Sequence, residues 1–311
     1  MTIYLPIAEM PVSILMVLAM GGAVGLISGL FGVGGGFLMT PLLIFSGIPP
    51  AVAVASVTPQ IVASSTSGAL SYWRRKQVDF KLALCLIGSG ALGALLGAEL
   101  FARLGSTGQL TLVIALSYTA FLATIGGLML NESIRAMIRN RAARKRGETV
   151  YAGRRAGMHG WIHRLPLKVR FRRSRLYISI LPVFGLGLTI SFLGTLLGIG
   201  GGFIMVPALI YLLKVPTSVV VGTSLVQIIG VMGIATVMHS VASQTVDVIL
   251  AFILMIGGVF GAQVGASMGQ ALRGEHLRAL LGILVLAVGL RFAFNLVVPP
   301  EDLFSFTVLN P

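Results

Sequence analysis

The stretch GVGGGFLMTPLLIF, at Gly32–Phe45, returns almost unchanged as GIGGGFIMVPALIY, at Gly198–Tyr211. Nine of the fourteen aligned positions are identical, which indicates an internal duplication. After a two-residue shift the alignment continues, and Asp79 matches Asp247. A ladder of spaced glycines, which we expect to let helices pack closely, recurs as Gly90, Gly93 and Gly97 in the first half and Gly258, Gly261 and Gly265 in the second.

The composition places this duplicated chain in a membrane. Of its 311 residues, 56% are apolar and 10% are charged, and its mean hydropathy is +0.96; soluble domains carry about 25% charged residues. Ten apolar segments, all expected to be helical, are 12–31, 36–47, 51–72, 80–102, 109–130, 177–197, 203–213, 218–240, 247–271 and 276–298. The second segment of each half holds only eleven or twelve residues. A helix of that length spans about 18 Å and cannot cross a hydrocarbon core of about 30 Å.

The basic residues orient the repeat. Fourteen of the 23 Lys and Arg fall between Asn131 and Arg175, and cytoplasmic loops are enriched in these residues. We therefore expect this loop in the cytoplasm, where it faces anionic lipid headgroups. Five segments precede the loop and five follow it. Because five is an odd number, the second copy begins on the opposite side of the membrane from the first and is inverted. The predicted fold is an all-α integral membrane protein, an inverted five-plus-five repeat with two interrupted or re-entrant half-helices and both termini outside.

Three parts result from this prediction: a first transmembrane repeat at 1–130, a basic cytoplasmic loop at 131–175 and a second transmembrane repeat at 176–311. The net charge of +14 would suggest nucleic acid as a partner of a soluble protein, but its concentration in one loop indicates membrane topology instead.

The sequence has no P-loop, HExxH or GxSxG motif, which argues against ATP-driven transport and against an enzyme. Cys85 is the only cysteine, so no internal disulfide or thiolate cluster can form. We expect no cofactor and no metal.

The glycine runs are the strongest candidates for a substrate site. They directly precede the two half-helices and comprise Gly34, Gly35 and Gly36 in the first copy and Gly200, Gly201 and Gly202 in the second. The first turn of such a helix presents free N–H groups and the positive end of the helix dipole near mid-depth. Two ends that approach from opposite sides form an anion site without a buried cation. The alternative is a purely structural role in a tight reversal and close packing.

Polar side chains in the third segment of each half are further candidates, because polar groups inside apolar segments face the bundle interior. They are Ser56, Thr58 and Gln60 in the first half and Thr223, Ser224 and Gln227 in the second. Hydroxyl and amide donors suit an oxyanion, although helix-to-helix hydrogen bonds explain them equally well. Pro59 interrupts the first set and predicts local unwinding.

Charged and titratable positions inside the segments are few. Arg291 and His239 are candidates for contact with an anion or a proton, although a place at the membrane interface is the simpler interpretation of both. Glu99 and Arg103, one helical turn apart, predict a local ion pair. The two matched aspartates stand at helix starts and are predicted to cap them.

With these residues, the chain resembles the TauE/SafE sulfite and organosulfonate exporter family, which is grouped with the toluene-sulfonate uptake permeases. The resemblance covers nearly the whole chain apart from 131–175. It rests on both glycine motifs, on 29–37 with Pro41, on 53–56 and 221–224, and on the helix starts 78–79 and 246–247. The chain departs from the family at Ala55, where the family often has threonine and the second half has Thr223.

The resemblance implies a secondary transporter that exports sulfite or a small organosulfonate anion across the bacterial inner membrane. A negative-inside potential favours outward movement of an anion, and unpaired intramembrane acids that could carry protons are scarce. A proton-coupled uptake permease for sulfur oxyanions or sulfonates is the alternative. A membrane-embedded enzyme or receptor is the rival from another class. The sequence leaves the choice of sulfur anion and the oligomeric state open.

Overall fold

The computed structural model describes residues 2–31, 34–124, 126–127, 166–171, 173–174, 176–268, 283 and 285–294. The chain divides into two compact units, and each unit takes segments from both halves of the sequence. The larger unit comprises Met1–Thr111 with Ala152–Leu272, and the smaller one comprises Leu112–Tyr151 with Arg273–Pro311. This spatial division differs from the division into repeats. Residues 131–165 of the basic loop lie outside the described part.

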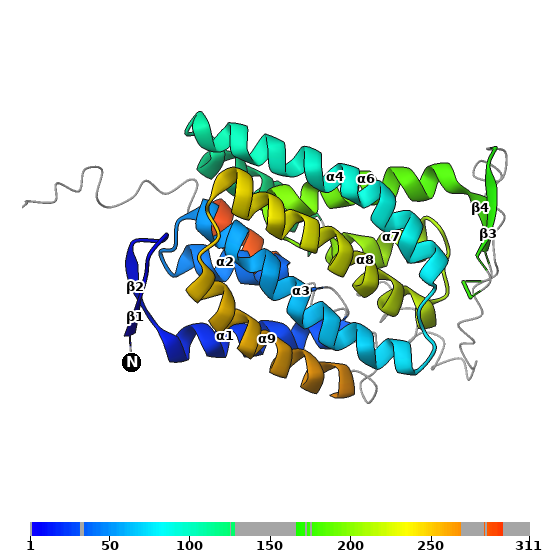
Figure 1. Cartoon of the computed structure of the whole chain (residues 1–311), viewed down its shortest axis with the longest axis horizontal. Coiled ribbons are helices and arrows are strands. Elements are labelled where there is room, and N and C mark those ends of the chain that lie inside the picture. The colour runs from blue at the N-terminus through cyan, green and yellow to red at the C-terminus, as the bar shows by residue number, and fades with distance from the viewer. Residues whose placement is uncertain are drawn as a thin grey trace, which may run out of the picture. The chain divides into compact units, whose positions relative to one another are not determined.

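Each half contributes a hairpin and four helices in the same order to the larger unit, and the second half adds a short π-helix (Figure 1). The first half forms β1 (Thr2–Leu5), β2 (Met10–Ser13), α1 (Ile14–Phe31), α2 (Gly36–Phe45), α3 (Pro50–Arg74) and α4 (Phe80–Ser106). The second half forms β3 (Lys168–Phe171), β4 (Leu176–Ser179), α6 (Ile180–Leu197), α7 (Gly202–Tyr211), α8 (Thr217–Met238), a short π-helix η2 (His239–Ser243) and α9 (Val248–Met268). Helices α2 and α7 have ten residues each, which confirms the short second segment of each half.

Each half opens with an antiparallel β-hairpin that the apolar pattern did not predict. β1 pairs with β2 and β3 pairs with β4, and the two hairpins lie at opposite ends of the helix bundle in Figure 1. From β1 through α2, every element boundary recurs 166 residues later, so the duplication begins well before the glycine motif. The signal in the sequence is a brief alternation, Ile3 and Leu5 in β1 and Val169 and Phe171 in β3. Four residues are too few to distinguish such a strand from a loop.

The start of the sixth predicted segment needs a correction. Its first residues form strand β4, and α6 begins only at Ile180. The Ser179 hydroxyl caps this start by accepting a hydrogen bond from the N–H of Leu181 at 3.3 Å. A serine cap of this kind satisfies one of the free donors of the first turn, which places the helix boundary after the strand.

The predicted unwinding at Pro59 is wrong, because α3 stays helical through this residue. Proline has no N–H, so the carbonyl of Ala55 loses its donor within the helix. The hydroxyl of Thr58 donates to that carbonyl oxygen at 2.8 Å. The neighbouring side chain thus replaces the missing backbone donor and the helix continues.

The glycine ladders bring helices of the two halves into close contact. Helix α1 packs along α9, and α4 packs along α6 (Figure 1). A Cβ on Gly93 of α4 would collide with the carbonyl oxygen of Leu188 in α6, and a Cβ on Gly261 of α9 would collide with that of Gly22 in α1. The ladders therefore form packing faces, as predicted. Each half's first long helix lies against the other half's last helix in this unit.

Two helices belong wholly or largely to the smaller unit, Leu110–Thr124 and Val285–Phe294. The ring of Tyr118 stacks on that of Phe292, with centroids 5.3 Å apart and 13° between the planes. A Cβ on Gly289 would lie 3.0 Å from the Cβ of Leu122. Aromatic stacking and a close glycine contact therefore join these two helices.

Five helices of the described part are long and apolar enough to cross a membrane: α1, α4, α6, the stretch Val219–Ser243 and α9. Helix α3 has 25 residues but is not among them, since its many Ser and Thr side chains lower its hydropathy. It packs against both α8 and α9. The chain is a multi-pass membrane protein, and its most polar long helix is partly enclosed by its neighbours.

Candidate functional site

The two glycine runs adopt the same backbone conformation. Gly35 and Gly201 are the N-caps of α2 and α7, with φ of 74° and 71°. The preceding Gly34 and Gly200 also have positive φ, 84° and 79°. A non-glycine residue in this left-handed region costs roughly 1–2 kcal/mol, so the chain needs glycine here for the reversal itself.

The two runs also meet in space. A Cβ on Gly36 would lie 2.5 Å from the carbonyl oxygen of Gly198, so backbone touches backbone. The hydroxyl of Thr40 donates to the same oxygen at 3.2 Å. The rings of Phe37 and Phe203 stack with centroids 4.5 Å apart and 12° between planes. The half-helices α2 and α7 therefore begin side by side in the core of the larger unit.

Apolar side chains fill the space around this crossing. The Ile61 side chain of α3 reaches both runs: its methyl groups lie 3.4 Å from a Cβ built on Gly34 and 3.1 Å from one built on Gly200. Ile228 of α8 covers Gly34 at 3.3 Å in the same way. The first-turn N–H groups of α2 and α7 point to a tightly packed region in this conformation.

The two glutamines are buried, but their amides differ in bonding. Both side chains are 0% exposed. The amide nitrogen of Gln227 donates to the hydroxyl of Ser191 at 3.2 Å, whereas neither the nitrogen nor the oxygen of Gln60 has a hydrogen-bond partner. Gly25 stands at the position of the first half that corresponds to Ser191. Since glycine has no hydroxyl, the Gln60 amide lacks the partner that its counterpart has.

Ser56 and Thr223 hold the starts of distant helices. The hydroxyl of Ser56 accepts a hydrogen bond from the N–H of Asp247 at 2.8 Å, and that of Thr223 accepts one from the N–H of Asp79 at 3.0 Å. These bonds join the third helix of one half to the last helix of the other in the larger unit. Both hydroxyls therefore hold helix starts. Ala55, which aligns with Thr223, needs no hydroxyl because Ser56 makes the equivalent bond in the first half.

The aspartates cap their helices as predicted and also hold the hairpins. Oδ1 of Asp79 accepts from the N–H of Leu82 at 3.3 Å, while Oδ2 accepts from the N–H and the hydroxyl of Ser174 at 2.9 and 2.8 Å. Oδ2 of Asp247 accepts from the N–H of Ile7 at 3.0 Å, and its Oδ1 accepts from two N–H groups of the α9 first turn. Each hairpin loop is therefore tied to the helix start of the opposite half.

Thr58 and Ser224 point their hydroxyls back to their own helices. Thr58 bonds the Ala55 carbonyl, and its oxygen also lies 3.0 Å from the hydroxyl oxygen of Thr236 on α8. Ser224 donates to the carbonyl of Val221 at 2.9 Å. Among the six polar candidates of the third segments, the fully unpartnered group is thus the Gln60 amide.

His239 is buried inside the larger unit, and its side chain is 0% exposed. Its Nε2 lies 3.2 Å from the carbonyl oxygen of Thr195 on α6. The ring of Phe101 on α4 packs edge-on at a centroid distance of 4.5 Å, and Nδ1 has no hydrogen-bond partner. Arg291, by contrast, is exposed on the helix Val285–Phe294 of the smaller unit.

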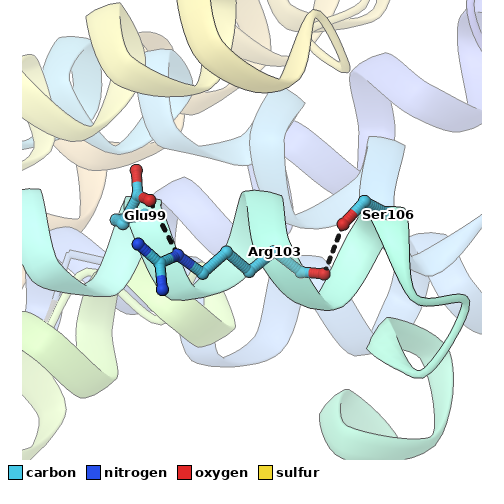
Figure 2. Close-up of polar contacts among 3 residues, drawn as sticks. All are labelled: Glu99, Arg103 and Ser106. Carbon is cyan, nitrogen blue, oxygen red and sulfur yellow. Dashed lines mark hydrogen bonds and ion pairs between the residues drawn. The ribbon is translucent and has the colours of Figure 1, made fainter.

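Glu99 and Arg103 form the predicted ion pair on the exposed surface of α4. Figure 2 shows the two side chains along the helix, with Nε of Arg103 2.8 Å from Oε1 of Glu99. The carbonyl of Arg103 also accepts a hydrogen bond from the Ser106 hydroxyl at 2.8 Å. An exposed pair of this kind contributes at most about 1 kcal/mol. It is a surface feature of the helix end.

A groove that the sequence did not reveal runs along α3 between α8 and α9, and we call it the α3 groove. Its volume is about 930 Å³. Its polar lining consists of Thr66, Ser67, Ser71 and Arg74 of α3, Thr236 of α8 and Gln263 of α9. The signal that would have found it is the recurrence of polar residues every three or four positions along the second half of α3.

Comparisons with known proteins agree with this architecture. The family described as "Sulfite exporter TauE/SafE" matches residues 17–292. A "Probable membrane transporter protein" of Xylella fastidiosa is 27% identical over 282 residues, 89% of this chain and 94% of that protein. The "Probable membrane transporter protein YjnA" of Bacillus subtilis is 28% identical over 289 residues, 91% of this chain and 99% of that protein.

A plant protein matches a shorter stretch. The "Sulfite exporter TauE/SafE family protein 3" of Arabidopsis thaliana is 33% identical over 102 residues, 32% of this chain and 21% of that protein. No solved structure matches the chain. The family match includes both glycine runs, both half-helices and the capping aspartates. The chain therefore belongs to the TauE/SafE sulfite exporter family and is a multi-pass membrane transporter of that family.

Proposed function

We propose that this transporter carries sulfite or a small organosulfonate anion outward across the bacterial inner membrane, by secondary transport. The observation that carries the proposal is the meeting of α2 and α7 at their glycine-rich N-termini. Both helices direct the N–H groups of their first turns and the positive ends of their dipoles to this region. A sulfite or sulfonate group offers three acceptor oxygens, which several converging donors can bind without a buried cation.

The two copies, in this proposal, are inverted in the membrane, with the β3–β4 end in the cytoplasm. Support comes from the hairpins at opposite ends of the bundle (Figure 1) and from the crossed pairing of α1 with α9 and α4 with α6. The β3–β4 end also carries Arg74, Arg75 and Lys76. Nη1 of Arg173 lies there too and donates to the carbonyl oxygen of Lys76 at 2.9 Å. Positive charge of this kind is typical of cytoplasmic ends.

The described acidic side chains support an anion as cargo. Asp79 and Asp247 are buried and fully engaged as caps, Glu99 is paired with Arg103, and Glu9 is exposed in the first hairpin. A cation site or a carboxylate proton carrier requires a buried carboxylate that has no hydrogen-bond donors of its own. None of these four carboxylates meets that condition. A negative-inside potential then drives an anion outward with about 2.3 kcal/mol per charge per 100 mV.

The conformation described here is closed at the proposed site. Ile61 fills the space between the two glycine runs, so an anion reaches the first-turn N–H groups only after this side chain moves. The unpartnered Gln60 amide is next to Ile61 in the sequence and lies against Gly258, whose Cβ would be 2.6 Å from Nε2. A buried amide without partners gains free energy when a ligand supplies an acceptor.

Gln60→Met tests the site with little structural cost. Because the Gln60 amide makes no hydrogen bond, we expect unchanged or higher thermal stability but anion binding weaker by roughly 1–3 kcal/mol. Gln227→Met is the matched variant, and it should lose stability because it breaks the bond to Ser191. Calorimetry with sulfite, sulfoacetate and taurine, together with thermal unfolding in detergent, measures both effects. Unaltered affinity for all three ligands in Gln60→Met would exclude this residue from the site.

One feature favours a second candidate, proton-coupled uptake of the same anions. His239 is buried with a free Nδ1, and imidazole is the side chain that most readily changes its charge near neutral pH. Flux of labelled sulfite and sulfonates in proteoliposomes decides between the two. For a sulfonate, whose charge does not change near neutral pH, export predicts voltage-driven flux that a pH gradient does not alter. Uptake predicts sulfonate flux that follows the proton gradient and is lost in His239→Phe. Absence of anion flux under every gradient would reject both functions.

A further inference from the structure

We propose that the α3 groove is the aqueous access path by which a small oxyanion travels between the Arg74 end of the bundle and its middle. The inference rests on the proposed function, because it assumes that the cargo is an anion. It adds a second set of residues to the transport machinery, on the face of α3 opposite to Ile61. The groove is lined by three helices of the larger unit.

The helix directions show which lining residues lie at each end of the groove. Helices α3 and α9 run parallel, because the start of α9 at Asp247 bonds Ser56 near the start of α3. Gln263 follows Asp247 by sixteen residues, which brings it level with the Ser71 to Arg74 turn of α3. Helix α8 runs in the opposite direction, since Thr236 near its end lies beside Thr58. The mouth is therefore formed by Arg74, Ser71 and Gln263, and the deep end by α8 and Pro59.

The groove is long enough to serve as half of a membrane path. Its lining on α3 extends from Arg74 to Pro59, fifteen residues that correspond to about 22 Å at 1.5 Å per residue. A hydrocarbon core is about 30 Å thick. Pro59 is two residues from Ile61, so the deep end lies at the depth of the glycine crossing. The side chain of Ile61 and the backbone of α3 then separate the groove from the crossing in this closed conformation.

The groove is lined by apolar as well as polar residues, and its apolar ones include Val62, Leu70 and Val259. Its polar side chains are costly in lipid and favourable around water. Thr66 and Arg74 are exposed, Ser71 is half-buried and Gln263 is exposed, and the Ser67 hydroxyl has no hydrogen-bond partner. Polar side chains at membrane depth face a water-filled cavity or the bundle interior. A wetted groove gives the Ser67 hydroxyl a partner and hydrates the exposed Arg74 and Gln263. It also explains the polar side chains that α3 carries on this face, Thr66, Ser67 and Ser71.

The charge at the mouth selects anions. Arg74, Arg75 and Lys76 follow one another there, and the two described carboxylates that are exposed lie elsewhere, Glu9 in the opposite hairpin and Glu99 beside Arg103. A cleft of one charge sign with low-dielectric walls concentrates counter-ions. The groove therefore attracts small oxyanions and repels cations before any specific contact is made.

Gly233 provides a way to block the groove without disturbing the fold. It lies on α8 at the deep end, and a Cβ built on it meets nothing within 4 Å. Gly233→Leu should therefore fold with unchanged thermal stability and lose most of its anion flux, because the side chain fills the path. Gly88→Leu is the matched control, since Gly88 of α4 is also open but outside the groove, and it should keep its flux. A folded Gly233→Leu protein with normal flux overturns the proposal.

Arg74→Gln tests the mouth against its neighbour. At low ionic strength we expect KM for the anion to rise roughly 3- to 10-fold with kcat little changed, and the difference to shrink as salt screens the charge. Arg75→Gln, which removes the same charge one residue beyond the lining, should change KM less. If the two variants raise KM equally, the positive charge acts as a general surface potential and Arg74 does not mark a defined mouth.

Thiol labelling tests the path independently of transport. In a Cys85→Ala background, Ser71→Cys in the groove should react faster with an anionic methanethiosulfonate than with its cationic analogue. Leu84→Cys, on the exposed face of α4 at 71% exposure, is expected to react slowly with both. Sulfoacetate should protect Ser71→Cys; sulfite is unsuitable as the protecting ligand because it attacks thiosulfonates.

The outcomes separate this inference from the proposed function. If Ser71→Cys reacts as slowly as Leu84→Cys while anion flux is normal, the groove is not the path and the proposed function stands. Fast, anion-selective labelling that sulfoacetate does not reduce supports the groove and contradicts sulfonates as the cargo.

Discussion

Gly36→Ala is expected to destabilise the folded transporter by about 3 kcal/mol and to abolish transport. The added methyl group would lie 2.5 Å from the carbonyl oxygen of Gly198 and would collide with Ile61. Ile61 can change its rotamer, but the Gly198 carbonyl belongs to the backbone of the second glycine run and also binds Thr40. The two half-helices must therefore separate, and the N-termini that form the proposed site move apart.

Gly36 isolates the steric effect because its φ is not positive. Gly35→Ala would combine crowding with backbone strain, since Gly35 has φ of 74°. Gly88→Ala is the control for a glycine in open space, and it should be neutral or stabilising because alanine favours helix by up to about 1 kcal/mol. Thermal unfolding in detergent and flux in proteoliposomes measure both variants. A Gly36→Ala protein as stable and active as Gly88→Ala would contradict the crossing of the two runs.

Asp79→Ala is expected to lower stability by about 3 kcal/mol, because three donors lose their acceptor at once. These are the N–H of Leu82 and the N–H and hydroxyl of Ser174, and Asp79 is only 3% exposed. Loss of the carboxylate uncaps α4 and releases the β3–β4 hairpin from the opposite half. Asp79→Asn should fall between the wild type and alanine, since an amide offers one acceptor oxygen but places an NH2 group opposite a donor.

Ser174→Ala provides the graded comparison. It removes the hydroxyl donor and leaves the backbone N–H of residue 174 to bind Asp79, so its cost should be about 1 kcal/mol. The series Asp79→Ala, Asp79→Asn and Ser174→Ala is read from thermal unfolding of the full-length protein. If Asp79→Ala costs no more than Ser174→Ala, the carboxylate is not the group that holds the hairpin.

Local features of this protein were predictable because neighbouring residues determine them. The length of the apolar runs predicts the short second helices, and the consecutive glycines predict the chain reversals before Gly36 and Gly202. Asp79 begins α4 as its cap, and the spacing of Glu99 and Arg103 produces their ion pair. In each case the interacting groups lie within four residues of one another, so helix geometry alone brings them together.

Other features depended on which helices became neighbours and how each is rotated. Ser56 binds the start of α9, 191 residues away, and no local pattern indicates that contact. Gln60 and Gln227 read alike in the sequence, yet only Gln227 finds a hydroxyl, because the helix that faces it carries serine where the other half has glycine. His239 is polar at a helix end, but α4 and α6 enclose it completely.

Short stretches of the sequence are enough to identify a duplicated membrane protein with two glycine-capped half-helices, since hydropathy and glycine conformation are local properties. Long-range packing brings the two glycine runs into contact, places Ile61 in the space between them and sets the polar face of α3 beside a groove. A helix shows its polar side in its sequence, whereas the partner for that side, another helix, lipid or water, is chosen by long-range packing.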